Sequence, residues 1–372
     1  MRIMLQGYLH NANFGDILAA KLFYDHCING GFSSVDFYQY KNYGIGDVCR
    51  KQLGYYTEKS LLSCFLSDAF LIISGGSFWN DGTIVNDAKI RYRRFILPAL
   101  IYQLMGKPVY VLGVGGGPVD TPWLRKKMVR LLNRAKRVTF RDNSTRKVFS
   151  EYGVKNEMTI TADTMLLIRD EMLDPLNERD ELEIASRGRK KLLLHMPDGA
   201  RETSYVADFI VPALICFLNC HKEYYLVLSN DNIRRIGREE VNEVNRVRRL
   251  LVDAEIEFYD YNYHDCWQMC SLISVMDCII TSKLHVGVVG CALDKCVVSF
   301  PVHREKTDNF YQMISESERC VNVRLLDVEK AYEQLCKFHD KPVHISEELR
   351  KKAEMNLSIL DDIISEDIDN GK

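Results

Sequence analysis

Lys283 and His285 are the residues whose types and spacing point most directly to chemistry. They follow the short apolar run Cys278–Thr281 and precede a stretch with the pattern of a helix. Open α/β sheets bind their ligands at such carboxyl ends of strands. We expect Ser282 to cap the helix, and the lysine and the imidazole to lie beside its electropositive N-terminus. This arrangement predicts a small anion, a phosphate or a carboxylate, as the ligand.

Three glycine-containing loops also follow apparent strands, at residues 11–16, 74–81 and 113–118. None has the Gly-Lys-Ser/Thr ending of a Walker loop or a complete GxGxxG pattern. Each alone is typical of an ordinary strand-to-helix turn, but in a parallel sheet all three would emerge at one edge. Asp16, which ends the first loop, is interpreted either as a helix N-cap or as a carboxylate that accepts a proton from a hydroxyl.

Two arginines add positive charge near strand ends. Arg141 directly follows an apolar run, and its guanidinium is suited to pair bidentately with a carboxylate or phosphate. The alternative is an ion pair with Asp142 or Asp163. Arg304 comes just after the apolar run at 297–301 and offers a second guanidinium for the same anion.

The elements that must position these residues follow an alternating pattern. Segments such as 16–27 and 123–135 are long enough for crossover helices, which is typical of a parallel, doubly wound sheet. The extended runs of the first half lie at 3–7, 35–40, 70–74, 109–113, 137–141 and 158–161. A second series lies at 192–195, 225–229, 255–259, 278–281 and 296–300.

We therefore predict an α/β protein with two Rossmann-like lobes. The N-terminal lobe spans 1–170, and the C-terminal lobe spans 192–326. Residues 171–191 are charged and read as the linker between them. Helices are expected over 327–372.

Composition limits the partners. A net charge of −2 over 372 residues gives no global electrostatic field that would attract nucleic acid or an anionic membrane, so anion binding must be local.

The sequence shows no secretory pattern and no stretch of about 20 apolar residues, which favours the cytoplasm. The 12 scattered cysteines read as reduced thiols. Zinc at Cys216/Cys220 or Cys266/Cys270 is the less favoured reading, because the pairs lack CxxC spacing.

The motifs together resemble the polysaccharide pyruvyl transferase family, in order over most of the chain, from Asn13 to about Phe310. The late Arg-Leu-His motif of the family is similar to Lys283-Leu284-His285, with lysine in place of arginine. Lysine keeps the charge and loses the guanidinium fork. The other matching segments are Asn-x-Gly-Asp at 13–16, the glycine loop ending in Asp at 74–81, Gly-x-Gly-x-Gly-Pro at 113–118, Arg-Asp-Asn-Ser at 141–144, which is similar to the Arg-Asp/Glu-x-x-Ser segment of the family, and Ala-Asp at 162–163.

The resemblance implies a fold similar to GT-B glycosyltransferases. The donor would be phosphoenolpyruvate, on the side of the lobe at 192–326. The acceptor, on the side of the lobe at 1–170, would be a sugar of a capsule or exopolysaccharide, or of its lipid-linked precursor. The product would be a pyruvate ketal bridging two hydroxyls, with release of phosphate. We expect no metal and no cofactor. The expected site is catalytic His285 and Asp16; donor-binding Lys283, Leu284, Arg141, Arg304, Ser282, Gly115 and Gly116; and acceptor-binding Asn13, Gly76, Trp79 and Asp81.

Two alternatives use the same residues differently. A nucleotide-sugar glycosyltransferase would hold a diphosphate with Lys283 and Arg141 and release a nucleoside diphosphate instead of phosphate. A non-catalytic glycan-binding or scaffold protein would bind the donor without turnover.

A lipid-linked acceptor would require only peripheral docking at the inner face of the membrane. Of the remaining histidines, which show no metal-ligand spacing, His195 at a strand end is the best placed.

Overall fold

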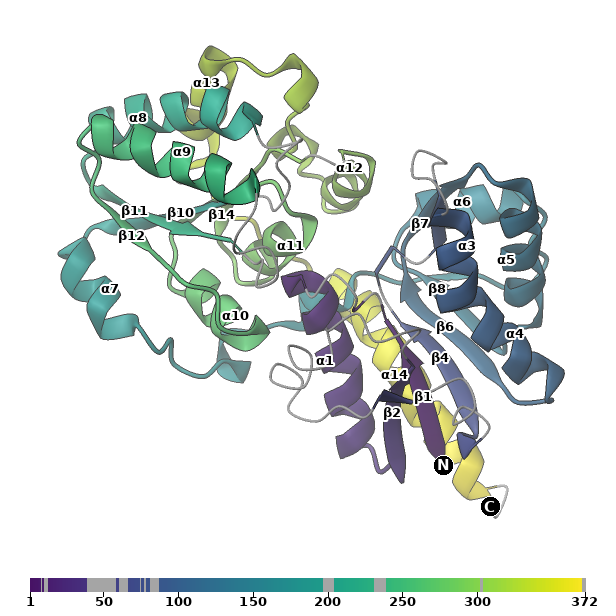
Figure 1. Cartoon of the computed structure of the whole chain (residues 1–372). Helices are drawn as coiled ribbons and strands as arrows, with labels where there is room; N and C mark the ends of the chain where they lie inside the picture. Colours follow the sequence, from purple (N-terminus) through teal and green to yellow (C-terminus); the bar gives the residue numbers. More distant parts are fainter. Residues whose placement is uncertain are drawn as a thin grey trace. The chain divides into compact units, whose positions relative to one another are not determined.

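The chain forms two compact units, each built on a parallel sheet (Figure 1). The first comprises Met1–Ala12, Asp16–Leu167 and Ser346–Lys372, and the second comprises Asn13–Gly15 and Ile168–Ile345. This computed structural model describes residues 1–7, 9, 13–38, 58–59, 66–73, 75–76, 78–80, 87–196, 204–230, 239–301 and 304–369.

The first unit contains a seven-stranded sheet of order β3-β2-β1-β4-β6-β8-β9 in which every pair is parallel. Strand order reverses between β1 and β4, which is where doubly wound sheets form their ligand crevice. Every residue of β4 and β6 is buried, as expected for strands covered on both faces. The strands are β1 (Arg2–Gln6), β2 (Ser34–Tyr38), β3 (Glu58–Lys59), β4 (Ala69–Ile73), β6 (Val109–Val114), β8 (Arg137–Phe140) and β9 (Thr159–Ile160), with β5 (Phe78–Asn80) and β7 (Gly116–Val119) forming a separate pair.

Helices cover both faces of this sheet (Figure 1). On one face α4 and α5 pack on the strands through a core that includes Tyr102, Met128 and Leu131. On the other face lie α1 and α14, which are joined by a bond between His26 Nε2 and Asp361 Oδ1. The helical elements are α1 (Phe14–Asn29), α3 (Asp87–Arg91), the π-helical turn η3 (Tyr92–Ile96), α4 (Leu97–Leu104), α5 (Pro122–Arg134), α6 (Asn143–Glu151), η4 (Thr164–Leu167) and α14 (Glu347–Asp369).

The second unit contains a five-stranded parallel sheet of order β12-β11-β10-β13-β14. Its strands are β10 (Lys190–His195), β11 (Tyr224–Ser229), β12 (Phe258–Asp260), β13 (Cys278–Thr281) and β14 (Cys296–Ser299). Its helices are α7 (Arg179–Ser186), α8 (Val211–Cys220), α9 (Glu239–Asp253), α10 (Cys266–Ser274), α11 (Leu284–Ala292), α12 (Arg304–Met313) and α13 (Val328–Phe338), with short turns η5 (Asp170–Met172), η6 (Val206–Ile210), η7 (Ser317–Arg319) and η8 (Val323–Leu325).

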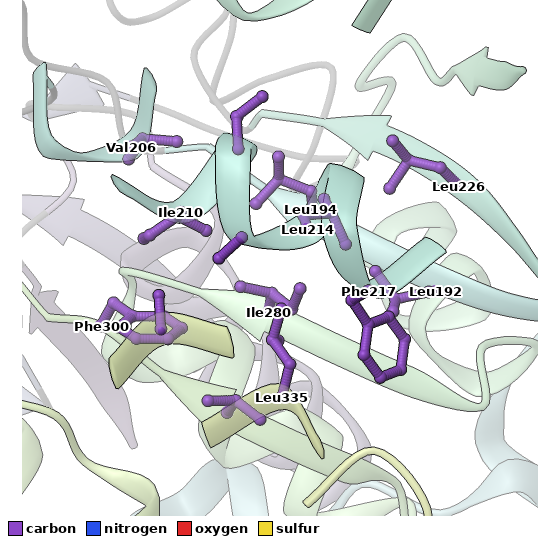
Figure 2. Packing of buried hydrophobic residues seen from close by; sticks show 14 of the residues in the cluster. Leu192, Leu194, Val206, Ile210, Leu214, Phe217, Leu226, Ile280, Phe300 and Leu335 are labelled. Carbon is purple, nitrogen blue, oxygen red and sulfur yellow. The ribbon is translucent and has the colours of Figure 1, made fainter. Parts of the chain in front are cut away.

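Aliphatic side chains of the central strands form the core of this unit (Figure 2). Leu192, Leu194 and Ile280 come from β10 and β13, and Phe217 and Leu335 pack against them from α8 and α13. Burying such side chains removes apolar surface from water, which is the main favourable term in folding. The core therefore fixes the carboxyl ends of β10 and β13, where His195 and the turn to Lys283 begin.

The α/β class is confirmed, and each predicted extended run overlaps a strand of one of the two large sheets. Strands β3, β5 and β7 were not predicted, and β12 begins three residues later than expected. The unit boundaries differ from the expected ones. Residues 171–191 include α7 and the start of β10 and group with the second unit. The expected helical tail is divided, because α13 groups with the second unit and α14 with the first.

Within the described ranges, no helix combines the length and the apolar character needed to cross a membrane. The ten cysteines that the structure describes are free thiols. Burial raises the pKa of Cys270 and Cys278, so these two thiols stay protonated. Cys216 and Cys220 are exposed on α8.

Asn356 of α14 is the polar link between the C-terminal helix and the first sheet. Its Oδ1 accepts a hydrogen bond from Thr139 Oγ1 (2.7 Å), and its Nδ2 donates to the Ala162 carbonyl (3.0 Å). Thr139 Oγ1 in turn accepts from the Gly113 amide at 2.7 Å. All of Asn356 is buried, so each of these groups depends on the others for hydrogen bonding.

We predict that Asn356→Ala lowers the free energy of unfolding by about 2 kcal/mol, because the O–H donor of Thr139 loses its acceptor and the Ala162 carbonyl loses its donor in the interior. Urea unfolding followed by circular dichroism measures the change. Ser358→Ala is the control, since Ser358 is exposed on the same helix and bonds only locally, to the Glu354 carbonyl. Equal stability of the two variants would contradict the prediction.

Candidate active site

The turn from β13 to α11 places Lys283 at the N-cap position of the helix. The Lys283 amide donates to Thr281 Oγ1 (3.0 Å), and this bond shapes the turn. The side chain of the N-cap residue itself makes no capping hydrogen bond to α11, whose first-turn amides point outward along the helix axis. The result is an electropositive helix end flanked by a lysine and an imidazole, both half-buried.

The expected capping role of Ser282 is wrong. Ser282 lies one residue before the N-cap, because Thr281 takes the Lys283 amide and the helix starts at Leu284. The Ser282 hydroxyl is buried, and within the described part of the chain it has no hydrogen-bond partner. A buried hydroxyl without a partner is uncommon, and a bound ligand is one way to satisfy it.

Close packing fixes α11 against the sheet. A Cβ on Gly290 would lie 2.8 Å from Ile279 Cδ1, and one on Gly287 would lie 2.8 Å from the Tyr311 hydroxyl. Burial raises the pKa of Tyr311, so its hydroxyl stays protonated against the helix. The first turn of α11 therefore has little freedom to move relative to β13.

Gly15 borders His285 closely. Asn13–Gly15 groups with the second unit, and a Cβ built on Gly15 would lie 1.8 Å from His285 Nδ1. Only glycine allows the imidazole to occupy this position. Asn13 is half-buried in the same segment.

A row of buried polar side chains ends four neighbouring strands of the second unit. His195 is paired in register with Ser229 on β11 and Thr281 on β13, and Thr281 with Ser299 on β14. All four are almost fully buried. Polar residues at the carboxyl edge of a parallel sheet lie where such folds bind ligands. The sequence signal was present, since each apolar strand run ends in a polar residue, but only His195 was singled out.

The glycine loops of the first unit are tied to one another. The Gly115 amide donates to the Gly75 carbonyl (3.0 Å), and the Gly116 amide donates to Thr145 Oγ1 (2.9 Å). Gly75 and Gly113 have positive φ angles of 72° and 63°, which favour glycine. The loops after β4 and β6 therefore meet, as predicted for one sheet edge.

Arg141 forms a buried ion pair with Asp163, with 2.8 Å between Nη1 and Oδ2. Asp142 instead caps α6 by accepting from the Thr145 amide (2.7 Å). The interpretation as an ion pair is thus correct for Asp163. A Cβ on Gly115 would lie 2.7 Å from Arg141 Nε, so the guanidinium lies directly against the glycine loop.

The remaining expected residues are less closely grouped. Asp16 is buried in the first turn of α1 and does not precede the helix, so the N-cap interpretation is wrong. Arg304 is half-exposed and pairs with Asp308 on its own helix (2.7 Å). The Gly76 carbonyl accepts from Arg91 Nη1 (3.1 Å).

Trp79 is half-buried, and a Cβ on Gly117 would lie 2.1 Å from its ring. Asp81 lies outside the described residues.

The expected site residues are divided between the two units. The second unit contains Ser282, Lys283, Leu284, His285 and Asn13, and the first contains Arg141, Gly115, Gly116, Gly76 and Trp79. Among the described residues no three His, Cys, Asp or Glu side chains are grouped as a metal site.

A model of the family described as polysaccharide pyruvyl transferase matches residues 13–304. The chain belongs to this family. The match includes the β13–α11 turn, the glycine loops and Arg141, and it ends before α13 and α14. Asn356 therefore lies outside the matched segment. No curated protein gave a match to the chain.

Solved structures with the same two-lobed fold include UDP-GlcNAc 2-epimerases. The Neisseria meningitidis enzyme bound to UDP-GlcNAc is 12% identical, covers 97% of this chain and 99% of its own, and has a TM-score of 0.63. The Methanocaldococcus jannaschii enzyme is 12% identical, with the same coverage and a TM-score of 0.60. The Anabaena protein HepE in complex with UDP is 12% identical over 100% of both chains, with a TM-score of 0.55. At this identity the likeness shows the GT-B-like fold alone.

We predict that Gly15→Ala displaces the His285 imidazole, because the added methyl group would overlap Nδ1. Histidine side-chain NMR resonances measure the displacement, with His285→Ala identifying the signal. Gly7→Ala is the control, since its Cβ would meet the nearest atom at an ordinary 3.7 Å. An unmoved His285 resonance in Gly15→Ala would contradict the prediction.

Proposed function

We propose that the chain transfers the pyruvyl group of phosphoenolpyruvate to two hydroxyls of one sugar in a polysaccharide or its lipid-linked precursor. The observation that carries this proposal is the N-terminus of α11, with Lys283 at the N-cap and His285 in the first turn. Family membership gives the polysaccharide and the transferase class. The donor, the ketal product and the residue roles are the proposal.

The chemistry of the donor suits this helix end. Phosphoenolpyruvate carries a phosphate and a carboxylate on three carbons, so a pocket for it needs cations and amide donors close together. The Lys283 ammonium and the first-turn amides of α11 supply both, and the buried Ser282 hydroxyl adds one donor. In the first unit, Arg141 and the amides of the glycine loop offer similar groups, although Asp163 already neutralises part of the guanidinium charge.

The proposed reaction needs two proton transfers. A proton adds to the methylene carbon of the donor, the first sugar hydroxyl attacks the neighbouring carbon, phosphate leaves, and the second hydroxyl closes the ketal. The two sugar hydroxyls lose one proton each. One of these protons balances the proton added to the methylene carbon, which becomes a methyl group, and the other leaves with the phosphate. In this mechanism His285 is the general acid at the donor, and Asp16 accepts a proton from the sugar hydroxyl.

We predict that phosphoenolpyruvate raises the melting temperature of the wild-type protein, because a ligand of the folded state stabilises it. Lys283→Met should weaken the binding by about 10-fold to 100-fold through loss of one charge-assisted contact. Lys283→Arg should keep it. Lys222→Met is the matched control, since Lys222 is an exposed lysine of the same unit that bonds to Asn219.

UDP, a UDP-sugar, pyruvate and inorganic phosphate complete the ligand panel. Stabilisation by UDP or its sugar, with none by phosphoenolpyruvate, would contradict the proposal in favour of glycosyl transfer.

We predict that His285→Ala lowers the rate of phosphate release from phosphoenolpyruvate, in the presence of acceptor glycan, by about 100-fold to 10,000-fold, which is the usual contribution of a general acid. Binding of the donor should persist. A near-wild-type rate would remove His285 from the mechanism. Donor binding without turnover in the wild type on every glycan tried would indicate a non-catalytic binding protein.

A further inference from the structure

The first unit carries a strongly asymmetric distribution of charge. From Ala88 to Arg141 the chain has thirteen Lys and Arg residues and one acidic residue, Asp120, whereas the whole chain has a net charge of −2. Besides β6, β7 and β8, this segment contains η3, α4, α5 and all of α3 except its first residue, Asp87. These helices pack together on one face of the seven-stranded sheet (Figure 1). Nine of the thirteen basic residues lie on α3, η3 and α5, whereas Lys136 pairs with Glu366 of α14 and Arg141 is buried.

Part of this charge serves the fold. Arg125 donates to the Val119 carbonyl from Nε (2.9 Å) and Nη2 (2.8 Å) and lies over the ring of Tyr152. Arg91 pairs with Asp87, and Lys107 donates to the Ser67 carbonyl. These residues are already committed to contacts within the unit.

A second group of basic residues lies on the exposed side of α5. Lys126, Lys127, Arg130 and Arg134 share one face of the helix, at spacings of three, four and seven residues. Within the described residues no carboxylate forms an ion pair with any of them. The opposite face of α5 is buried through Leu124, Met128, Leu131 and Leu132.

Exposed apolar side chains lie near both ends of α5. At the start of α5, Trp123 is 41% exposed, and its ring packs edge-on against Tyr92 with 5.5 Å between centroids. Near the end of α5, Gln103 Nε2 donates to the Leu131 carbonyl (2.9 Å), which holds the end of α4 there. Leu104, the last residue of α4, and Met105, its C-cap, are 71% and 39% exposed.

We propose that this face of α5, with Trp123 and Leu104 at its ends, docks on an anionic phospholipid surface. Basic side chains are attracted to lipid phosphates, and an exposed tryptophan is suited to the boundary between headgroups and acyl chains. A soluble polyanion would use the charges but would leave Trp123, Leu104 and Met105 in water. The inference goes beyond the proposed transfer reaction and does not depend on it.

Sedimentation of the full chain with vesicles tests the proposal. Vesicles of phosphatidylcholine mixed with phosphatidylglycerol should bind the protein, and vesicles of phosphatidylcholine alone should not. Binding should weaken as salt is added, because exposed charges are screened. Failure to bind the mixed vesicles at low salt would overturn the proposal whatever the result of the donor experiments.

Variants locate the surface. The double variant Lys126→Gln/Arg130→Gln should bind the mixed vesicles about 25-fold more weakly than the wild type. The reason is that each basic residue near an anionic surface contributes about fivefold to the affinity. The corresponding double Glu variant should weaken it further. The matched control is Arg249→Glu with Arg324→Glu, two exposed arginines of the second unit. Equal loss in this control would overturn the assignment to α5.

Trp123→Ala separates a membrane from a soluble polyanion. It should weaken binding to mixed vesicles and leave any binding to dextran sulfate unchanged. Unchanged vesicle binding, together with equally tight binding of dextran sulfate, would overturn the proposal in favour of a polyanion site. Melting curves confirm that each variant is folded.

Discussion

Every strand pair in the two large sheets is parallel, so within each unit all strands end at the same edge. This hydrogen-bonding constraint brings residues that are distant in sequence into one row. In the second unit it aligns Ser229, His195, Thr281 and Ser299, and α11 begins directly beyond Thr281. In the first unit it joins the glycine loops after β4 and β6. Without parallel pairing, neither group would form.

Much of this arrangement could be predicted from local sequence. Apolar runs four to six residues long fall on the observed strands, and polar residues at their ends lie at the sheet edges. The predicted cap at Ser282 was wrong because the competing Thr281 hydroxyl, one residue earlier, binds the Lys283 amide. Asp142 and Asp163 were both plausible partners of Arg141, and only the fold distinguishes them. Asn356 could not be predicted, because Thr139, its partner, lies 217 residues earlier in the chain.

The lysine at position 283 is consistent with the local geometry. An N-cap residue has an extended backbone, and Lys283 has this conformation, with φ −101° and ψ 129°. A flexible ammonium can follow an anion at the helix end without the fixed orientation that a guanidinium requires. The rigid guanidinium is found in the other unit, where Asp163 holds Arg141 against Gly115. The two cations therefore differ in burial, since Arg141 is almost fully buried and Lys283 is half-buried.

The return of α14 to the first unit has a consequence for synthesis on the ribosome. Residues Ile168–Ile345 of the second unit are made before Asn356, so the second unit is complete while the first still lacks its last helix. Domains generally fold as units in order of synthesis. Here the N-terminal unit begins first and finishes last. Until α14 arrives, Thr139 and the Ala162 carbonyl must be hydrated, and one face of the N-terminal sheet is a surface on which nascent chains could aggregate or chaperones could bind.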